Sequence, residues 1–531
     1  MENTIFSLIP PLLALIMVLL TRKVILSLSI GSIAAAFILA EWNFTETLRL
    51  LWETIAGLFY ADGSLNTSNI YIILFLLLLG CITAFVTISG GSRAFGEWAL
   101  KRVKTRAGAQ LIAGLLGIII FIDDYFNSLA VGQIARPLTD RNRVSRAKLA
   151  YIIDSTAAPI CVVSPISSWG AYIIAILVPI LAANSMDISG FSAFIQMIPM
   201  NLYVWVSLLL VFITSWKNIN IGSMKVHEQR AIETGAVTNP DKSVPGELKS
   251  DLPTSSKGTV MDLLVPIVAL IIGTITAMLW TGMQAVEGQV TILKIFENTD
   301  VPPSLFYGGL FGFGVTLILF LRQIYVKKAV DAQFFFKGFK EGINSMLPAV
   351  YILLSAWVLV DLISALETGS YLASFVEKSN INMAFIPVIL FILAGIMALS
   401  TGTSWGSFGI LLPLAGDIVA TMDSSMLLPS LAAVLAGAVF GDHCSPISDT
   451  TILSSTGAGC NHIDHVVTQL PYALTAAAVS IVGYLVLGFT GSTILSLLMV
   501  IALLLIVLFI FSQRNHVMNE SNSYSVLSED E

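Results

Sequence analysis

Charged residues are scarce in this chain. Only 11% of its 531 residues are Asp, Glu, Lys or Arg, whereas 56% are hydrophobic and the mean hydropathy is +0.85. A soluble globular protein carries roughly 25% charged residues, so this chain lacks the charge that a water-facing surface requires. The composition excludes an ordinary soluble protein and predicts a polytopic membrane protein whose main neighbours are membrane lipids.

Basic residues and cysteines are also few. The 27 Lys and Arg against 34 Asp and Glu give a net charge of -7, which excludes a basic surface for nucleic acid. The four cysteines lie in or beside apolar segments without CxxC spacing, so neither a disulfide framework nor a structural zinc site is expected. Residues 1–20 lack the basic start and the small-residue cleavage site of a secretory signal peptide.

What the chain has in abundance is long apolar runs. About 20 apolar residues are needed to cross a ~30 Å hydrocarbon core as a helix. Nine runs meet this length and predict ordinary transmembrane helices at 4–20, 24–40, 70–89, 191–214, 260–281, 303–321, 343–366, 466–489 and 491–512.

Four further apolar stretches are interrupted by polar residues. Residues 148–182 and 427–458 are too long for one straight helix and contain Ser, Pro and Gly, so each predicts a broken span. Residues 107–139 and 383–416 are too short for two crossings, so each predicts a re-entrant hairpin. The expected fold is all-α, with about 11 transmembrane helices plus two re-entrant hairpins.

The distribution of Lys and Arg predicts the orientation, because short basic loops remain in the cytoplasm. With the N-terminus outside and the C-terminus cytoplasmic, 24 of the 27 basic residues fall in predicted cytoplasmic segments. The exceptions are Arg49, Lys294 and Lys378. We therefore expect a multi-pass protein of the inner or plasma membrane, with hairpin 107–139 entering from inside and hairpin 383–416 from outside.

Two parts of the chain repeat the same order of elements in opposite orientation. Each contains a span, a hairpin, a broken span and a second span, and the sequence SPIS at 164–167 recurs at 445–448. Such an inverted-topology repeat is typical of secondary transporters, whose sites lie where the broken elements meet.

These features divide the chain into six segments. They are the N-terminal helices with an external segment (1–66), the first inverted repeat (67–215), a cytoplasmic linker (216–259), connecting helices with a cytoplasmic loop (260–342), the second inverted repeat (343–490), and the last helix with a cytoplasmic tail (491–531). The linker carries both charge signs with Pro, Gly, Ser and Thr, a composition typical of a flexible connection.

Ionisable side chains inside apolar spans are candidate functional residues, because placing one in lipid costs at least ~2.5–3.5 kcal/mol. Polar neighbours on the same interrupted elements join them. The candidates are Asp123, Asp124 and Asn127 in the first hairpin, Asp154, Ser155 and Thr156 in the first broken span, Thr401, Thr403, Ser404 and Ser407 in the second hairpin, and Asp442, His443, Asp449, Thr450 and Thr451 in the second broken span.

These residue types suit a small hard cation. Na+ prefers carboxylate, hydroxyl and carbonyl oxygens, and an interrupted helix frees backbone carbonyls to join them. Two carboxylates crowded in a low-dielectric site cannot both ionise cheaply, so one retains a proton that a bound cation displaces. We expect Na+ at Asp124, Asp442 and Asp449, proton coupling through these three with Asp123 and His443, and no cofactor beyond the transported ions.

Structural roles compete with these assignments in the first repeat. Adjacent Asp123 and Asp124 point to different sides of a helix, so one of them could cap the helix or pair with Arg136. Asp154 could likewise cap its broken helix. The Ser and Thr residues either ligate an ion or satisfy backbone groups that the helix breaks expose.

The second repeat leaves similar alternatives. Asp442 and Asp449 lie seven residues apart and share one helical face if the helix is continuous. His443 serves as well for a structural hydrogen bond as for proton transfer. His462 and His465 are expected to be solvated loop residues, because they follow the last apolar residues of the broken span.

Two segments resemble the NhaC-type Na+/H+ antiporter family: FIDDYFNSLAVGQIARPLTDRNRVSRAKLAYIIDSTAAPICVVSPISSWG at 121–170 and FGDHCSPISDTTILSSTGAGCNHIDHVVTQLPYA at 440–473. The resemblance covers both repeats. It implies inverted repeats with re-entrant hairpins, often in a homodimer with a moving transport domain. By the resemblance, the site residues are Asp124, Asn127, Asp154, Ser155, Thr156, Asp442, Ser445, Asp449 and Thr450.

We therefore expect a secondary active transporter that exchanges cytoplasmic Na+ for external H+ by alternating access. A Na+- or H+-coupled transporter of a small carboxylate or amino acid is the alternative on the same scaffold, and an ion channel is a further one. Enzyme activity is not expected. An intramembrane hydrolase is poorly supported, because Ser445 and His443 lack the separation and the orienting third group of a nucleophile and its base.

Overall fold

The computed structural model describes residues 4–21, 23–61, 63–121, 123–165, 167–184, 186–240, 242, 244, 254–286, 290–368, 371, 382–420 and 424–529. Ile166, within the first SPIS sequence, and Lys378 lie outside the described residues. The chain is nearly all helical, as the apolar runs predict. One small antiparallel pair of strands joins β1 (Tyr60–Ala61) to β2 (Ser64–Leu65).

Among the described residues, eight helices are long and apolar enough to cross a membrane. They fit a multi-pass membrane protein and are α4 (Thr67–Ile88), α13 (Met261–Ala285), α15 (Val301–Tyr325), α16 (Phe334–Ala365), α18 with its 3-10 start (Met383–Thr401), α20 (Leu427–Cys444), α22 (His462–Thr490) and the first part of α23 (Thr493–Gln513). α1 (Ile9–Thr21) and α2 (Val24–Leu39) are shorter, with 13 and 16 residues.

The apolar run at 191–214 forms a bent pair instead of the expected straight helix. Gly190–Met200 and Leu202–Lys217 meet at 51°, and the number of candidate spans rises to nine if this pair is one span. The pair consists of α10 (Gly190–Met197), η2 (Ile198–Met200) and α11 (Leu202–Lys217). Pro199 lies at the bend, and proline has no N–H to continue the helical hydrogen bonds.

Each of the four interrupted stretches contains two helices. They are α6 (Arg106–Ile119) and α7 (Asp124–Arg141), α8 (Arg146–Val163) and α9 (Ser168–Ala183), α18 (Ile386–Thr401) and α19 (Ser404–Ala420), and α20 (Leu427–Cys444) and α21 (Asp449–Ala458). Capping residues restart these helices: the Phe126 N–H donates to Asp123 (3.0 Å), and the Gly170 N–H donates to Ser167 (2.9 Å). Gly402 ends α18 with a φ of 71°, a left-handed conformation that glycine adopts at no steric cost.

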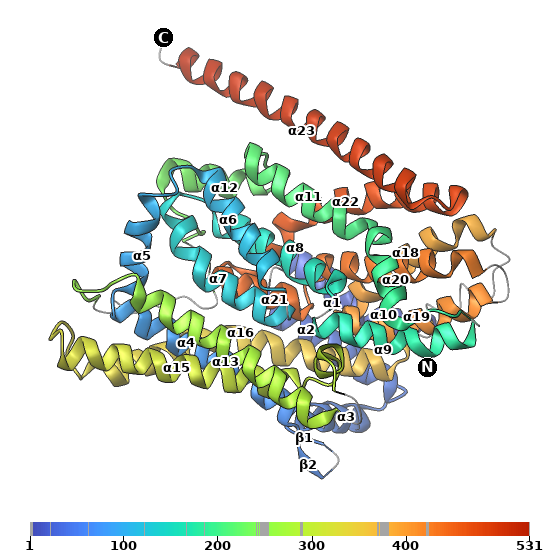
Figure 1. The fold of residues 1–531 in the computed structure, drawn as a ribbon, viewed down its shortest axis with the longest axis horizontal. Helices are drawn as coiled ribbons and strands as arrows, with labels where there is room; N and C mark the ends of the chain where they lie inside the picture. The colour runs from blue at the N-terminus through green and yellow to red at the C-terminus, as the bar shows by residue number, and fades with distance from the viewer. Residues whose placement is uncertain are drawn as a thin grey trace.

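Two groups of helices pack against each other. In Figure 1, α4, α13, α15 and α16 run along the lower side of the molecule, and α4 contacts each of the other three. In the second group, α7 packs on α8 and α21, and α18 packs on α20. Buried side chains of both groups belong to one hydrophobic cluster. The interrupted helices therefore lie inside the protein, where their freed backbone groups find partners.

A close crossing joins the first hairpin segment to the second broken one. A Cβ placed on Gly132 of α7 would lie 2.3 Å from the backbone carbonyl of Gly457 in α21. Only glycine permits this approach, and small residues at such crossings let helix backbones meet in membrane proteins. The crossing brings the residues at the start of α7 within reach of α21.

The remaining elements surround these two groups. They are η1 (Ile5–Leu8), α3 (Phe44–Gly57), α5 (Gly91–Leu100), α14 (Ile292–Glu297), η3 (Met383–Phe385), η4 (Ser424–Met426) and α23 (Thr493–Glu529). α23 crosses the top of the view in Figure 1 and carries the C-terminus away from the body.

The linker at 216–259 is not flexible throughout, contrary to its composition. α12 (Met224–Thr234) lies within it and buries Glu228. The Glu228 carboxylate pairs with Arg106 at the start of α6 and accepts a hydrogen bond from the Ser145 N–H before α8 (2.7 Å). These partners compensate the burial of the charge and hold α12 against α6 and the start of α8.

Candidate functional site

A cavity of about 290 Å³ lies at the start of α7. Asp123, Asp124 and Tyr125 line it on one side, and Thr403 and Trp405 line it from the junction of α18 and α19. The rest of the wall is apolar and comes from α4 and α15. The helix breaks at 120–123 and at 402–403, far apart in the sequence, therefore reach one cavity.

Asp124 is, with Asp123, one of two buried carboxylates that line this cavity. Its Oδ1 accepts a hydrogen bond from the Trp169 indole N–H of α9 (2.8 Å), and its Oδ2 has no hydrogen-bond partner among the described residues. Asn127, one turn further along α7, donates through Nδ2 to the carbonyls of Gly117 and Ile120 (2.6 Å each), while its Oδ1 also lacks a partner there. Two buried oxygen acceptors thus remain available on adjacent turns.

Asp123 has the structural role that the sequence left open. Its side chain caps α7 through the Phe126 N–H, and it lines the cavity next to Asp124. Two neighbouring carboxyl groups thus line the cavity, where a cation would interact with them more strongly than in water.

Asp442 and Asp449 do not share one continuous helical face. Asp442 lies in the last turn of α20 and Asp449 begins α21, because the chain leaves helical geometry at Ser445–Ser448. Asp442 accepts hydrogen bonds from the hydroxyls of Ser448 and Thr450 (3.1 Å to the latter). The shared helical face expected for a continuous helix is therefore absent. The two carboxylates have different hydrogen-bond partners.

Asp449 connects α21 to the cavity. Its Oδ2 accepts a hydrogen bond from the Tyr125 hydroxyl (2.6 Å) and another from the Trp357 indole N–H of α16 (3.3 Å). Neither aromatic residue was predicted as a site residue. Tyr125 lies within the segment 121–170 that carries the family resemblance, but nothing in the sequence connects its hydroxyl or Trp357 to Asp449. Only the folded chain brings the two side chains to a carboxylate more than 90 positions away.

Asp154 is the centre of a buried polar cluster and not a cap. It lies in the middle of α8 and accepts hydrogen bonds from Ser454 (3.1 Å), His465 (3.2 Å) and Gln469. Ser454 also bonds to Ser128 of α7 (3.1 Å). This cluster joins α7, α8, α21 and α22 by side-chain hydrogen bonds.

The expected solvated loop at His462 and His465 is wrong, because α22 already begins at His462 and buries both rings. His462 bonds to the Pro446 carbonyl (2.8 Å) and to the Ser455 hydroxyl (3.2 Å). Predicting a span only from the apolar residues at 466 onward placed the preceding polar turn outside the helix. Its buried polar partners explain why that turn is tolerated inside the protein.

His443 and Ser445 form hydrogen bonds with different partners. His443 Nδ1 lies 3.1 Å from the Tyr203 hydroxyl, and Ser445 donates to the Leu399 carbonyl (3.0 Å). The pair is therefore not arranged as a nucleophile and its base. His443 has the buried structural hydrogen bond that the sequence allowed as an alternative to proton transfer.

The candidate hydroxyls mostly satisfy backbone carbonyls. Thr156 donates to Ile152, Thr401 to Met397, Ser404 to Ala438, and Ser407 to Thr403 (2.8–3.3 Å). Thr451 donates weakly to the Asp442 carbonyl (3.4 Å), and Ser155 is buried in α8. Within the part of the chain that the structure describes, no three His, Cys, Asp or Glu side chains group as metal ligands.

Comparison with known proteins shows the family to which the chain belongs. The model of the Na+/H+ antiporter family matches residues 160–489. The chain is 46% identical over 519 residues to an uncharacterized protein of Haemophilus influenzae. The alignment covers 97% of this chain and 96% of that protein.

Two further relatives match over a shorter region. The chain is 32% identical over 158 residues to the malate-2H+/Na+-lactate antiporter of Bacillus subtilis, covering 28% of this chain and 31% of that protein. It is 32% identical over 148 residues to an uncharacterized Na+/H+ antiporter of Haemophilus influenzae, again covering 28% and 31%.

Proposed function

Because the chain belongs to the Na+/H+ antiporter family, we propose that it exchanges cytoplasmic Na+ for external H+ across the cell membrane by alternating access. The family and its antiporter relatives support a secondary transporter in a multi-pass membrane protein. The proposal that the exchanged ions are Na+ and H+ depends on the chemistry of the cavity at Asp124.

The observation that carries this proposal is a pair of buried oxygens. Asp124 Oδ2 and Asn127 Oδ1 are both buried without a hydrogen-bond partner among the described residues, although buried polar atoms normally have one. A carboxylate and an amide oxygen on adjacent turns suit Na+ or a proton better than any apolar occupant. Carbonyls freed near the breaks at 120–123 and 402–403 supply further oxygens.

Exchange follows when both ions use one carboxylate. A proton on Asp124 removes the negative charge that attracts Na+, and bound Na+ disfavours the protonated form. Asp449 reaches the same cavity through the hydrogen bond from Tyr125, and Asp442 lies across the break between α20 and α21 from Asp449. Na+ at Asp124, with Asp442 and Asp449 contributing to proton coupling, is the arrangement that we propose.

The proposal includes the membrane topology. We propose that the helix pairs α6–α7 and α18–α19 are re-entrant hairpins of an inverted repeat, with 11 spans, the N-terminus outside and the C-terminus cytoplasmic. Breaks at corresponding places in the two repeats support this arrangement. A homodimer with a moving transport domain is the assembly that the family resemblance implies.

A second candidate function is coupled exchange of a small carboxylate. Its support is the 32% identity to a relative named as a malate-2H+/Na+-lactate antiporter. The same cavity would then admit an organic acid together with the ion. The apolar wall contributed by α4 and α15 is compatible with the carbon skeleton of such a solute.

The decisive experiment is flux in proteoliposomes of purified protein. With an imposed pH gradient and no organic solute, we expect Na+ to move against its own gradient. Asp124→Asn keeps the side-chain volume and an acceptor for Trp169, so the protein should insert normally and lose coupled flux. Asp187→Asn, which removes an exposed carboxylate, is the matched control and should retain it.

The outcomes separate the candidates. Wild-type Na+ flux from Asp124→Asn protein would refute the role of Asp124. Flux that requires added malate or lactate would favour the second candidate. Ion movement only down the electrochemical gradient, independent of the pH gradient, would indicate a channel instead of an exchanger.

A further inference from the structure

A second cavity, of about 390 Å³, lies away from Asp124 at the other end of α7. It is bounded by the last turns of α7, by α4 and α13, by the start of α5, and by the first residue of α8. The basic segments that border it, 90–106 and 136–148, are the ones that the charge distribution places in the cytoplasm. The cavity therefore belongs to the proposed cytoplasmic side.

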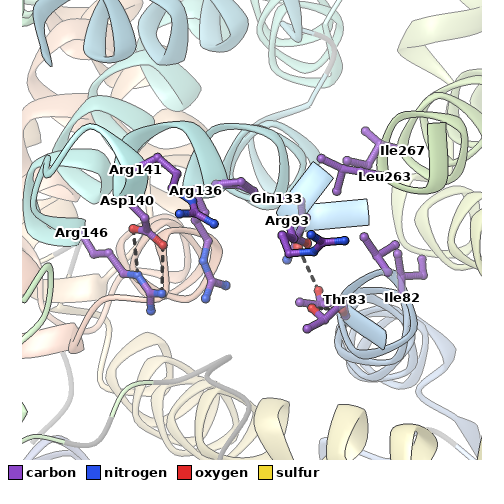
Figure 2. A pocket seen from close by; sticks show the side chains of 14 residues that line it. Ile82, Thr83, Arg93, Gln133, Arg136, Asp140, Arg141, Arg146, Leu263 and Ile267 are labelled. Carbon is purple, nitrogen blue, oxygen red and sulfur yellow. Dashed lines mark hydrogen bonds and ion pairs between the residues drawn. The ribbon is translucent and has the colours of Figure 1, made fainter. Parts of the chain in front are cut away.

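The lining of this cavity is strongly basic. Arg93, Arg136, Arg141 and Arg146 line it, as Figure 2 shows, and Asp140 is its one acidic side chain. The lining thus carries four positive side chains against one negative one, in a chain where only 11% of residues are charged. A cavity lined mainly by cationic side chains attracts anions.

Two of the arginines are each held by one carboxylate and by backbone carbonyls. Arg93 forms an ion pair with the exposed Glu97 (3.2 Å) and donates to the carbonyls of Ser255 and Ser256 (3.1 Å each). Arg146 forms a fork with Asp140 (3.1 and 3.3 Å) and donates to the Gly459 carbonyl (3.2 Å).

Arg141 differs from these two. It forms no ion pair with any residue that the structure describes, and its side chain is exposed. Fixed guanidinium groups beside a free one make a preorganised receptor for oxyanions, because the planar fork of arginine matches carboxylate and phosphate oxygens.

The remaining lining indicates the size and the kind of anion. Ile82 and Val86 of α4 and Leu263 and Ile267 of α13 give the cavity its apolar lining, and a hydrogen-bonded neutral pair, Thr83 and Gln133 (2.9 Å), also lines it. A volume of this size fits an organic ligand better than a single inorganic ion such as chloride.

We propose that this cavity binds a small organic anion carrying at least two carboxylate or phosphate charges, taken from the cytoplasmic side. The ligand bridges α7 to α4, α5 and α13 through Arg93 and Arg141, and its carbon skeleton lies against the aliphatic wall. A soluble di- or tricarboxylate and the phosphate headgroup of an anionic lipid share this chemistry, and basic pockets at membrane surfaces can bind such headgroups. The proposal is independent of Na+/H+ exchange, because binding alone tests it.

The test is calorimetric titration of detergent-purified protein with citrate and with inorganic phosphate, at constant ionic strength set with choline chloride. A parallel titration uses mixed micelles containing phosphatidylglycerol. We expect saturable citrate binding that weakens about tenfold or more in Arg141→Gln and in Arg93→Gln, because each loses a charge-assisted hydrogen bond.

The control is Arg143→Gln, which removes a charge from the same segment but donates to the Ile232 carbonyl outside the cavity (2.9 Å). Its citrate affinity should stay within about twofold of wild type. Thermal unfolding of each variant shows whether it is folded, and Arg141→Gln removes no bond to a described residue.

Each outcome decides the proposal. Binding of phosphatidylglycerol with the same sensitivity to Arg93 and Arg141, and displacement of citrate by it, would assign the lipid headgroup as the source of the anion. Absence of saturable binding by all three probes, or affinity equal in wild type and both cavity variants, would overturn the site.

Discussion

The Tyr125 hydroxyl donates a hydrogen bond of 2.6 Å to Asp449 Oδ2 and so joins the start of α7 to the start of α21. The two residues lie 324 positions apart, one in each proposed repeat. Together with the hydrogen bond between Ser128 and Ser454 (3.1 Å), this contact ties α7 to α21 by side chains. Tyr125 follows Asp124 directly in the chain, so the contact places Asp449 next to the cavity that Asp124 lines.

Tyr125→Phe tests that connection. The ring remains and the donor is lost, so Asp449 keeps only the longer bond from Trp357 (3.3 Å). We expect thermal stability in detergent to fall by the equivalent of about 1–3 kcal/mol, because hydrogen bonds to charged groups contribute this much. Tyr60→Phe, at an exposed tyrosine, should leave the unfolding temperature unchanged. Equal effects of the two changes would contradict the contact.

Asp154 and His465 should be energetically coupled. Their side chains meet at 3.2 Å inside the protein, so Asp154→Asn and His465→Gln together should cost less than the sum of the two single changes. The expected coupling energy is about 0.5–3 kcal/mol, measured by unfolding of the four proteins in a double-mutant cycle.

A control double-mutant cycle combines Asp154→Asn with His462→Gln instead of His465→Gln. His462 is also buried on α22 but bonds to Pro446 and Ser455. That cycle should be additive within about 0.5 kcal/mol. Additivity of the Asp154 and His465 cycle itself would show that the hydrogen bond does not contribute to stability.

Gly459→Ala should destabilise the end of α21. Gly459 has a φ of 62°, and an added Cβ would lie 2.7 Å from the guanidinium of Arg136. Gly491 has nearly the same backbone conformation, with φ of 63°, but nothing within 4 Å of the position of a Cβ. Both alanine variants carry the backbone cost, about 1 kcal/mol, and only the first must also displace the guanidinium of Arg136, so its unfolding midpoint should fall further. Unfolding midpoints that fall equally would exclude a role for the Arg136 contact.

Na+ binding should strengthen as the pH rises from 6 to 9. Protons then leave the carboxylates of the site, and by reciprocal linkage bound Na+ should release protons into a weak buffer. Asp442→Asn and Asp449→Asn should each weaken this pH dependence, whereas Asp187→Asn should not. Unchanged pH dependence and proton release in both site variants would make the two carboxyls structural.

The topology predicts which engineered cysteines react from outside intact cells. In a background that replaces the four native cysteines, Pro240→Cys and Glu520→Cys should react with an impermeant maleimide only after the membrane is opened. Asp187→Cys, in a predicted external loop, should react in intact cells. Labelling of position 240 or 520 in intact cells would reverse the proposed orientation.

The helical breaks could be predicted because they arise from local chemistry. Pro, Gly, Ser and Asp at 120–123, 164–167, 402–403 and 445–448 exclude continuous helix or supply caps, and these properties belong to single residues. Asp124 could be selected for the same reason, since an ionisable group in an apolar stretch requires a partner or a function. The structure places it in a buried cavity.

The partners of the carboxylates could not be predicted from the sequence. Trp169, Tyr125 and Gln469 lie in unrelated segments, and their contacts with Asp124, Asp449 and Asp154 depend on how five helices cross. The polar turn at His462 was placed outside the membrane domain, because hydropathy measures a segment without its neighbours. The sequence also predicts one straight helix where the chain bends at Pro199, because the residues at 191–214 are apolar throughout most of their length.

The pairing of Glu228 with Arg106 and Ser145 fixes α12 to α6 and α8, although α12 lies in the connection between the two proposed repeats. A polypeptide that ends after α12 retains every partner of Glu228. If the first fragment ends before Met224, Glu228 belongs to the second fragment, and Arg106 has no ion-pair partner within the first. Insertions, tags and split points are therefore compatible with assembly between α12 and α13, and a division of the protein into two co-expressed chains belongs there.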